Sequence, residues 1–200
     1  NSYYGFSVST AGDVNGDGYS DIIVGSYNYS EDQNREGKVF VYYGSSAGLP
    51  STPNWTAESN QSLSQFGYSV STAGDVNGDG YSDIVVGARS FTNAESNEGA
   101  VFVYYGSANG LPQNYDWMNE SNIIGCRYGH SVSSAGDING DGYSDLIVGV
   151  LFYSNGELNE GAVFVFYGSS SGLPSTYSYL TESNSENSLF GYSVSGSGDI

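Results

Sequence analysis

The chain has 200 residues, of which 22 are acidic and only four are lysine or arginine, giving a formal net charge of −18. This balance argues against nucleic acid and anionic membrane surfaces as partners, because both reward clusters of Lys and Arg. With 29 glycines, 19 tyrosines, one cysteine and no long apolar run, the composition favours an all-β fold without an intrachain disulfide or membrane insertion.

One unit is repeated along the chain at a spacing of 62 residues, marked by an acidic stretch that begins at residues 13, 75, 137 and 199. A repeat of this length predicts a structure assembled from equivalent units. Residues 1–200 are interpreted as one repeat segment, with units at about 4–65, 66–127 and 128–189 and the start of a fourth at 190–200.

Each unit opens with a short predicted strand that begins with an aromatic residue and a glycine. It reads Phe-Gly-Tyr-Ser-Val-Ser at residues 66–71, and its equivalents are residues 4–9, 128–133 and 190–195. The only histidine, His130, stands where the other copies have phenylalanine or tyrosine, which indicates a packed ring rather than a catalytic base.

The next element is an acidic loop, Asp-Val-Asn-Gly-Asp-Gly-Tyr-Ser-Asp in the first two units. Three carboxylates so close together repel one another, so their repetition indicates a bound hard cation. Calcium loops of this kind use side-chain oxygens at positions 1, 3 and 5, glycine at 6, a carbonyl at 7 and a further ligand at 9. The predicted ligands of one Ca²⁺ per loop are Asp13, Asn15, Asp17, Tyr19 and Asp21, then Asp75, Asn77, Asp79, Tyr81 and Asp83, then Asp137, Asn139, Asp141, Tyr143 and Asp145.

Two other kinds of loop agree less well with this pattern. An EF-hand requires Glu at position 12, where this chain has Val24, Val86 and Val148 inside predicted strands. A metal-free Asn-Gly or Asp-Gly turn leaves the aspartates at positions 1, 5 and 9 of all three copies unexplained. The loop is therefore predicted to join two strands and to hold calcium.

Three further strands complete the predicted unit. The second is a short apolar run, residues 83–87 in the middle unit, and the third alternates valine with aromatic residues over 100–106. A more polar fourth strand around Trp117, with Trp55 and Tyr179 as equivalents, is predicted to be the outer edge. Inner strands that are apolar on both faces belong between neighbouring sheets. This favours the four-stranded antiparallel blades of a β-propeller over a linear β-solenoid.

The stretch between the second and third strands differs from copy to copy and occupies residues 26–36, 88–98 and 150–160. Recognition usually resides in such loops on a rigid scaffold, and these leave the end opposite the acidic loops. Their aromatic residues could anchor a protein or stack on a sugar, or they could cover the ends of the blades. The candidate ligand-binding residues are Tyr27, Tyr29, Arg89, Phe91, Phe152 and Tyr153.

Taken together, these motifs resemble the FG-GAP repeats of integrin α-subunit propellers and of many secreted bacterial proteins. The resemblance is carried by Phe66-Gly67, the loop at 75–83, Val86-Gly87-Ala88 and residues 99–104, in that order and spacing. It implies an extracellular, secreted or cell-surface protein with calcium between the first and second strands of each blade. It also implies a ring of seven blades, so further blades from the same chain or from another copy are expected beside the three and a fraction present here.

Two departures from the family pattern are visible. The Gly-Ala-Pro segment that gives the family its name lacks proline in every copy, as in Gly87-Ala88-Arg89. Asn15, Asn77 and Asn139 replace a frequent aspartate, which removes one negative charge per loop and lowers the expected calcium affinity.

The sequence supports binding better than catalysis, and the chain is not expected to be an enzyme. No Ser-His-Asp or Cys-His set can be assembled, and the single Cys126 replaces a serine of the other copies. The recurring Glu58, Glu120 and Glu182 are interpreted as a solvated edge. Three functions stay open: adhesion through a protein or glycan ligand, a structural or assembly module of a larger surface protein, and a non-catalytic domain attached to a secreted enzyme.

Overall fold

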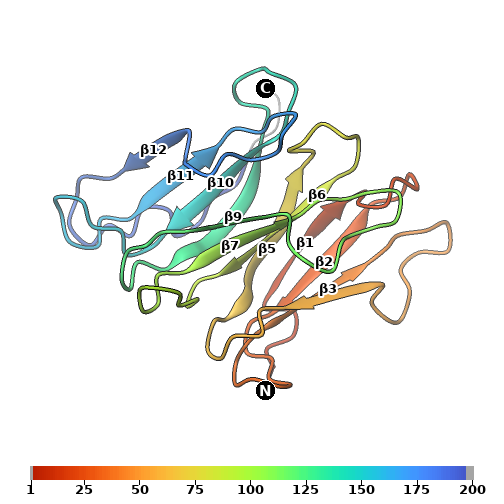
Figure 1. The fold of residues 1–200 in the computed structure, drawn as a ribbon, viewed down its shortest axis with the longest axis horizontal. Coiled ribbons are helices and arrows are strands. Elements are labelled where there is room, and N and C mark those ends of the chain that lie inside the picture. The colour runs from red at the N-terminus through yellow and green to blue at the C-terminus, as the bar shows by residue number, and fades with distance from the viewer. Residues whose placement is uncertain (1, 197–200) are drawn as a thin grey trace.

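The structure, a computed structural model, describes residues 2–196 and arranges them in twelve strands without a helix (Figure 1). The first sheet contains β1 (Ser7–Gly12), β2 (Asp21–Ser26), β3 (Lys38–Tyr42) and β4 (Trp55–Glu58). The second contains β5 (Phe66–Gly74), β6 (Asp83–Ala88), β7 (Ala100–Tyr104) and β8 (Trp117–Glu120). The third contains β9 (Tyr128–Gly136), β10 (Asp145–Val150), β11 (Ala162–Phe166) and β12 (Tyr179–Glu182). These described residues thus include no helix able to cross a membrane.

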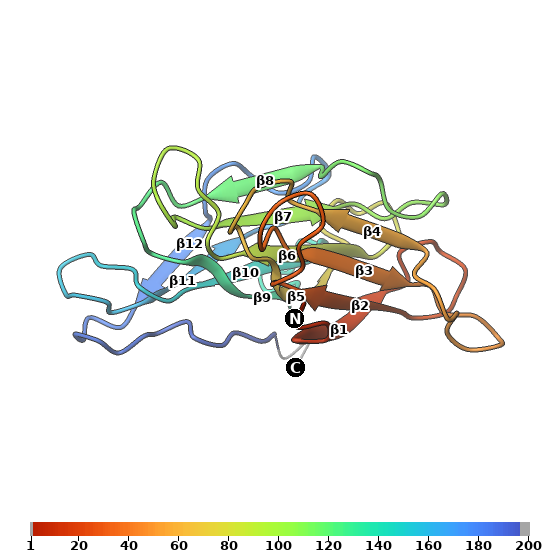
Figure 2. The same ribbon diagram turned by 90° about the horizontal axis from the view of Figure 1, so that it is seen from below.

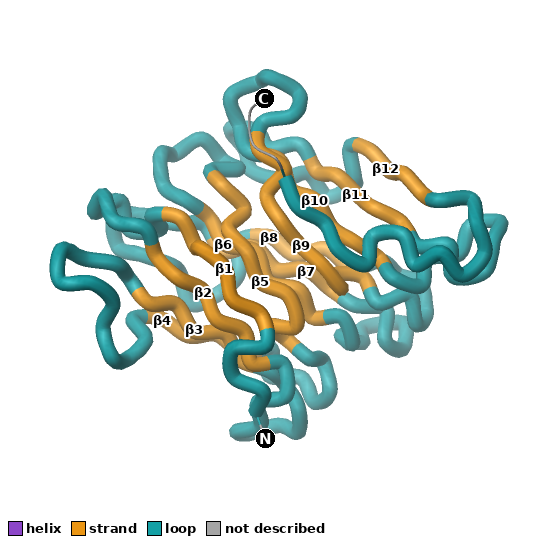
Figure 3. Tube along the Cα trace, turned by 180° about the vertical axis from the view of Figure 1, so that it is seen from behind, coloured by secondary structure: helices purple, strands orange, loops and turns teal. Residues whose placement is uncertain are grey.

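Each sheet is antiparallel and follows chain order, so one repeat forms one four-stranded blade. The colour gradient shows the second blade between the first and the third (Figure 2). The first strands β1, β5 and β9 lie side by side at the centre (Figure 3), and each fourth strand is the edge of its sheet farthest from the first strand. This arrangement confirms the predicted all-β propeller blades. The fourth acidic stretch, predicted to begin at residue 199, lies outside the described residues.

The first strand of each blade reaches further along the chain than predicted. β5 covers Phe66–Gly74, whereas the prediction ended at residue 71, and β1 and β9 also run on to the acidic loop. A register shift after Thr72 lets Gly74 pair with Asp83, and the Thr72 hydroxyl accepts a hydrogen bond from Gly74 N (3.0 Å). A β-bulge therefore carries the pairing up to the loop.

The third strands end earlier than predicted. β7 ends at Tyr104 rather than at residue 106, because Gly106 N donates a hydrogen bond to the carboxylate of Asp83 (2.9 Å). A side chain of the acidic loop thus sets the end of the third strand.

The middle blade shows that its inner strands are buried on both faces. Every residue of β6 and β7 is buried, including Asp83. Val86 and Phe102 belong to a hydrophobic cluster shared with the first blade, and Val85 and Val103 belong to one shared with the third. The cores therefore lie between blades, and each blade depends on its neighbours.

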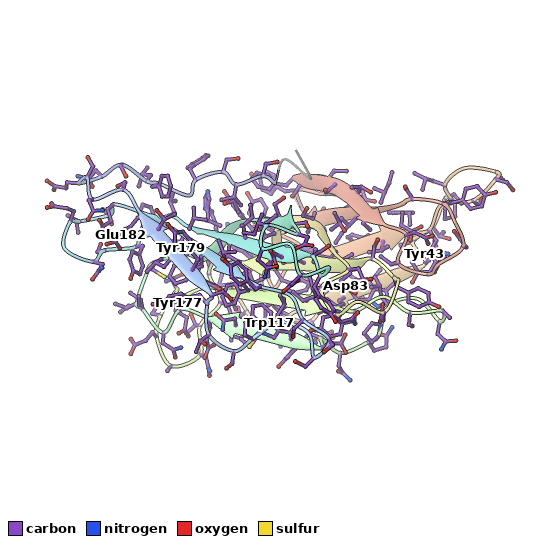
Figure 4. The ribbon with its side chains drawn as sticks, turned by 90° about the horizontal axis from the view of Figure 1, so that it is seen from above. Tyr43, Asp83, Trp117, Tyr177, Tyr179 and Glu182 are labelled. Atoms are coloured by element: carbon purple, nitrogen blue, oxygen red, sulfur yellow. The ribbon has the colours of Figure 1, made fainter. Side chains whose placement is uncertain are left out.

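The tryptophan at the start of the outer strand in the first and second blades packs on the next blade. Trp55 packs on Tyr104 with ring centroids 4.9 Å apart, and its indole nitrogen donates to the carbonyl of Pro112 (2.9 Å). Trp117 makes the equivalent contacts with the third blade and is only 9% exposed. Tyr179, at the same position of the third blade, has no following blade among the described residues and is 54% exposed. Figure 4 labels Trp117 in the middle of the molecule and Tyr179 near its side.

Replacing Trp117 and Tyr179 one at a time measures how much the junction between the second and third blades contributes to the free energy of unfolding. We expect Trp117→Ala to lower the free energy of unfolding by about 3 to 5 kcal/mol, because it removes a buried ring and its hydrogen bond. Tyr179→Ala is the matched control and should cost less than about 1 kcal/mol, since that ring is mostly exposed. Urea unfolding in excess Ca²⁺ measures both. Equal losses would contradict packing of Trp117 against the third blade.

The first blade also leaves one face open. Val8 is 58% exposed, whereas Val70 and Val132 at the same position are 5% and 7% exposed. Leu49 is exposed as well, while its equivalent Leu111 is buried against the first blade. The outer faces of the first and third blades thus lack the neighbour that covers every equivalent surface inside the molecule.

Candidate metal loops and the opposite end of the blades

The antiparallel strand order separates two ends of the molecule. The loops at residues 13–21, 75–83 and 137–145 all lie at one end, here called the acidic-loop end. The connections from second to third strands, and those that lead to the next blade, lie at the other end, here called the opposite end. The candidate metal ligands and the candidate ligand-binding residues therefore lie at different ends.

Within each acidic loop, the first aspartate gathers the backbone around its carboxylate. In the middle blade, Asp75 accepts hydrogen bonds from the N–H groups of Gly78 (2.7 Å), Asp79 (3.1 Å) and Gly80 (2.8 Å). Asn77 Oδ1 accepts another from Asp79 N (3.0 Å), and the Asn77 amide donates to Asp79 Oδ2 (3.0 Å). The other two loops repeat these bonds. Loop positions 1, 3 and 5 are thus drawn together around one small turn.

The last aspartate of each loop is buried and held by the backbone. In the middle blade, Asp83 Oδ2 accepts a hydrogen bond from Val76 N and Oδ1 accepts one from Gly106 N, both at 2.9 Å. Burial raises the pKa of Asp83 to about 7; the two hydrogen bonds oppose this shift, and the charges of the other two loop aspartates add to it. The equivalent aspartates of the other blades have pKa values raised by the same causes.

The donor set of these loops fits a hard divalent cation. Every candidate ligand offers oxygen, and each carboxylate keeps lone pairs beyond those used by its hydrogen bonds. A cation beside Asp83 would favour its ionised form and so lower its pKa. Across residues 2–196, no three Asp, Glu, His or Cys side chains converge closely enough to hold a metal ion. The calcium ligands therefore stay a prediction. In the structure, Asp75, Asn77 and Asp79 lie together in one turn, and the Asp83 carboxylate accepts hydrogen bonds from backbone N–H groups.

The acidic loops also join one blade to the next, a role that the sequence pattern did not predict. Ser82 N donates to the carbonyl of Asp13 (3.0 Å), and Asp13 N donates to Ser82 Oγ (3.2 Å). The ring of Tyr81 lies so close to Gly16 that a β-carbon added there would be 2.5 Å from it. Equivalent contacts join the second loop to the third. The available signal was the recurrence of Tyr and Ser at loop positions 7 and 8, because metal ligation requires neither side chain.

At the opposite end, three candidate ligand-binding aromatics cover the blades. Tyr29, Phe91 and Tyr153 pack edge to face on the phenylalanine of the adjacent third strand, with ring centroids 6.1, 5.6 and 5.7 Å apart. This geometry corresponds to the blade-end role that the sequence left open. Phe152, by contrast, is 36% exposed.

A row of rings, here called the ring row, crosses the blades beside the first strands. Tyr27 packs on Phe6 (4.6 Å between centroids) and on Tyr68 (5.3 Å). Tyr68 packs in turn on His130 (5.1 Å), and His130 packs on Tyr192 (5.0 Å). His130 is buried within this row, so the prediction that it replaces an aromatic ring is confirmed.

We expect His130 to make the protein less stable as the pH falls from about 6.5 to about 4. Burial and the charges of Arg89 and Arg127 lower the pKa of its imidazole from 6.5 to about 4. Between these values the unfolded chain binds a proton that the folded chain does not. The shift corresponds to about 3 kcal/mol of the free energy of unfolding, which solvent screening around the ring reduces to about 2 kcal/mol. Urea unfolding across this pH range measures the loss. His130→Tyr, which places the residue of Tyr68 and Tyr192 there, should flatten the slope; an identical slope would contradict the assignment.

A buried glutamate anchors each variable loop. Glu98 is fully buried, and its Oε1 accepts hydrogen bonds from two backbone N–H groups of its own loop (2.6 and 3.3 Å). Asn93 Nδ2 donates to Glu120 (2.9 Å), which is half-buried, so the interpretation of this position as a solvated edge is wrong. In the first blade the equivalent Glu58 lies 3.6 Å from Lys38. These carboxylates hold the loops at the opposite end.

The single thiol has a structural environment. Cys126 is buried, with Sγ 2.9 Å from Ser121 Oγ and 3.3 Å from the carbonyl oxygen of Glu98. A serine hydroxyl makes the equivalent contacts in the first blade. Burial raises the pKa of the thiol, which disfavours the reactive thiolate.

Blades of four antiparallel strands, each with an acidic loop between its first two strands, define a β-propeller built from repeats. A family model for the FG-GAP repeat matches residues 4–42, 66–104 and 128–166, the first three strands of each blade. These matches cover more than half of the chain, which therefore belongs to the FG-GAP repeat family.

The similar proteins are much longer than this chain. It is 32% identical to integrin alpha-8 of Gallus gallus over 99% of its own length and 33% identical to integrin alpha-8 of Mus musculus over its full length. Phosphatidylinositol-glycan-specific phospholipase D of Bos taurus is 34% identical over 81% of the chain. The chain spans only 19%, 18% and 20% of these three proteins, respectively.

Proposed function

We propose that the chain is a calcium-stabilised segment of an extracellular β-propeller that binds a protein or glycan through its opposite end. The observation that carries this proposal is the difference between the two ends. The acidic-loop end repeats the same hydrogen bonds in every blade, which suits a structural ion. The opposite end changes from blade to blade, as with Tyr27, Arg89 and Leu151 at one position, which suits recognition.

The similarity to integrin alpha-8 over nearly the entire chain supports an adhesive role at a cell surface or in a secreted protein. Further blades, from the same chain or from another copy, would cover the open faces around Val8 and Tyr179. Calcium would then act at a distance from the ligand, by holding the blades that carry the variable loops.

Arrays of purified extracellular proteins and of glycans, probed in Ca²⁺ and in EGTA, test the proposal. We expect binding in Ca²⁺ that Phe152→Ser weakens, because Phe152 is exposed at the opposite end. Asn109→Ala, at an exposed position of the acidic-loop end, is the matched control and should leave binding unchanged. If nothing binds in either condition, the adhesive proposal is wrong.

The match to a phospholipase D favours a second candidate function, a non-catalytic domain attached to a secreted enzyme. In that case the blades would pack on a catalytic domain of the same protein and need no external ligand. Mass spectrometry of the native protein after limited proteolysis would show whether such a domain is attached.

A further inference from the structure

Two of the four basic residues of the chain meet at the opposite end, beside the ring row. Arg89 follows β6 and Arg127 precedes β9, and both are partly exposed. The Arg127 guanidinium donates to the hydroxyl of Ser90, and Ser90 in turn donates to Gln65 Oε1 (3.0 Å). Arg89 Nε donates to the same Gln65 oxygen (2.8 Å). One network therefore fixes both guanidiniums at the junction of the second and third blades.

Neither guanidinium has an acidic partner among residues 2–196, although the chain carries 22 acidic residues. The ion pairs within residues 2–196 all belong to Lys38, which lies 2.8 Å from Glu31 and 3.6 Å from Glu58. Burial lowers the pKa of Arg89, and the positive charge of Arg127 adds to this shift. Two neighbouring cations without a counter-ion thus create a local positive potential on a strongly negative protein.

The aromatic face nearest to Arg89 is already covered. The guanidinium carbon of Arg89 lies 3.6 Å from the ring centroid of Tyr68. Tyr68 and Tyr192 both pack on His130, whose Nδ1 is buried without a hydrogen-bond partner in the described part of the chain. Tyr192, which is 63% exposed, offers an open ring face on the far side of His130. The guanidiniums, however, carry more N–H donors than their neutral neighbours accept.

We propose that Arg89 and Arg127 together bind a carboxylate side chain from an acidic segment of a protein partner. The inference rests on the proposed function and names the chemistry of its ligand. Arginine binds carboxylates through paired, charge-assisted hydrogen bonds. Because Gln65 and Ser90 already hold the two side chains, little conformational entropy is lost on binding. The partner would contact two blades at once.

Fluorescence anisotropy with a labelled oligoglutamate peptide in Ca²⁺ tests this site, with oligoglutamine as the neutral control. We expect Arg89→Leu and Arg127→Gln each to weaken binding about tenfold, as for the loss of a charge-assisted hydrogen bond. Other blades have Leu151 and Gln65 at these positions, so both variants are compatible with the fold. Arg35→Gln makes the same charge change at an exposed arginine of the first blade and should alter affinity less than about twofold.

An NMR titration of His130 tests the site without any variant. The groups around its imidazole are the two arginines, Tyr68 and Tyr192. At about pH 6, where glutamate side chains are ionised, saturating oligoglutamate should shift the ring resonances of His130 toward those of the protonated imidazole, because a bound carboxylate offsets the arginine charges and raises the imidazole pKa. Unchanged His130 resonances would overturn the inference. So would an equal loss of binding in Arg35→Gln and Arg89→Leu, or tighter binding of oligogalacturonate through the same arginines.

The failure of this inference differs from the failure of the proposed function. If purified protein partners bind the chain and both arginine variants bind them equally well, the carboxylate site is wrong and the binding role of the opposite end stands. If no protein or glycan binds the unaltered chain, the broader proposal fails first.

Discussion

Removing calcium is expected to lower the melting temperature by about 15 to 30 °C. An ion present at about 100 times its Kd adds about 2.7 kcal/mol per site, and the chain has three loops. Without the ion, the carboxylates of each loop repel one another, and Asp83 is buried where its ionised form is disfavoured. The loops also join the blades through Tyr81 and Ser82, so a loosened loop weakens a junction as well. Calorimetric scans in Ca²⁺ and in EGTA measure the shift.

A single-loop variant provides the control for this experiment. Asp79→Asn removes one charged ligand but keeps an oxygen that can accept the hydrogen bond from Tyr81 N (3.0 Å). We expect it to remove about a third of the calcium-dependent shift, because the other two loops are unchanged. Mg²⁺ at the same ionic strength separates specific binding from screening. Identical melting temperatures in Ca²⁺ and EGTA would mean that the loops are turns without a metal.

The blade architecture could be predicted because each repeat shows the same pattern. The stretch at residues 100–106 has no polar face, which indicates a strand covered on both sides, and β7 is buried throughout. The strand ends could not be predicted in the same way, since they depend on contacts distant in sequence. Gly106 N, for example, donates its hydrogen bond to the Asp83 carboxylate, and this ends β7.

The sequence reveals more of the acidic-loop end than of the opposite end. The acidic loops are visible because metal ligation fixes oxygen donors at local positions, as in Asp75, Asn77 and Asp79. The pair formed by Arg89 and Arg127 is not visible, because its members lie far apart in the sequence, after β6 and just before β9, and neither recurs at its position in another copy. Only the packing of one blade on the next brings them together.

A close approach between two blades predicts the other large effect. Gly99→Ala is expected to lower the free energy of unfolding by about 4 kcal/mol, through a strained backbone and a steric clash. Gly99 has a φ of +81° and pairs with Tyr128 of the next blade. A β-carbon added there would lie 2.2 Å from Tyr128 O and 2.6 Å from Tyr128 N. Backbone atoms cannot rotate aside, so alanine must separate the second and third blades.

Gly125→Ala isolates the backbone part of this cost. Gly125 also has a positive φ, +73°, but an added β-carbon would meet no atom within 4 Å. Its replacement should therefore cost only about 1 kcal/mol. Urea unfolding in excess Ca²⁺ compares the two variants, and equal losses would show that close blade contact adds nothing at Gly99. Gly37→Ala, whose β-carbon would lie 2.0 Å from Phe66 O, should reproduce the larger loss at the first junction, because the same contact joins the first two blades.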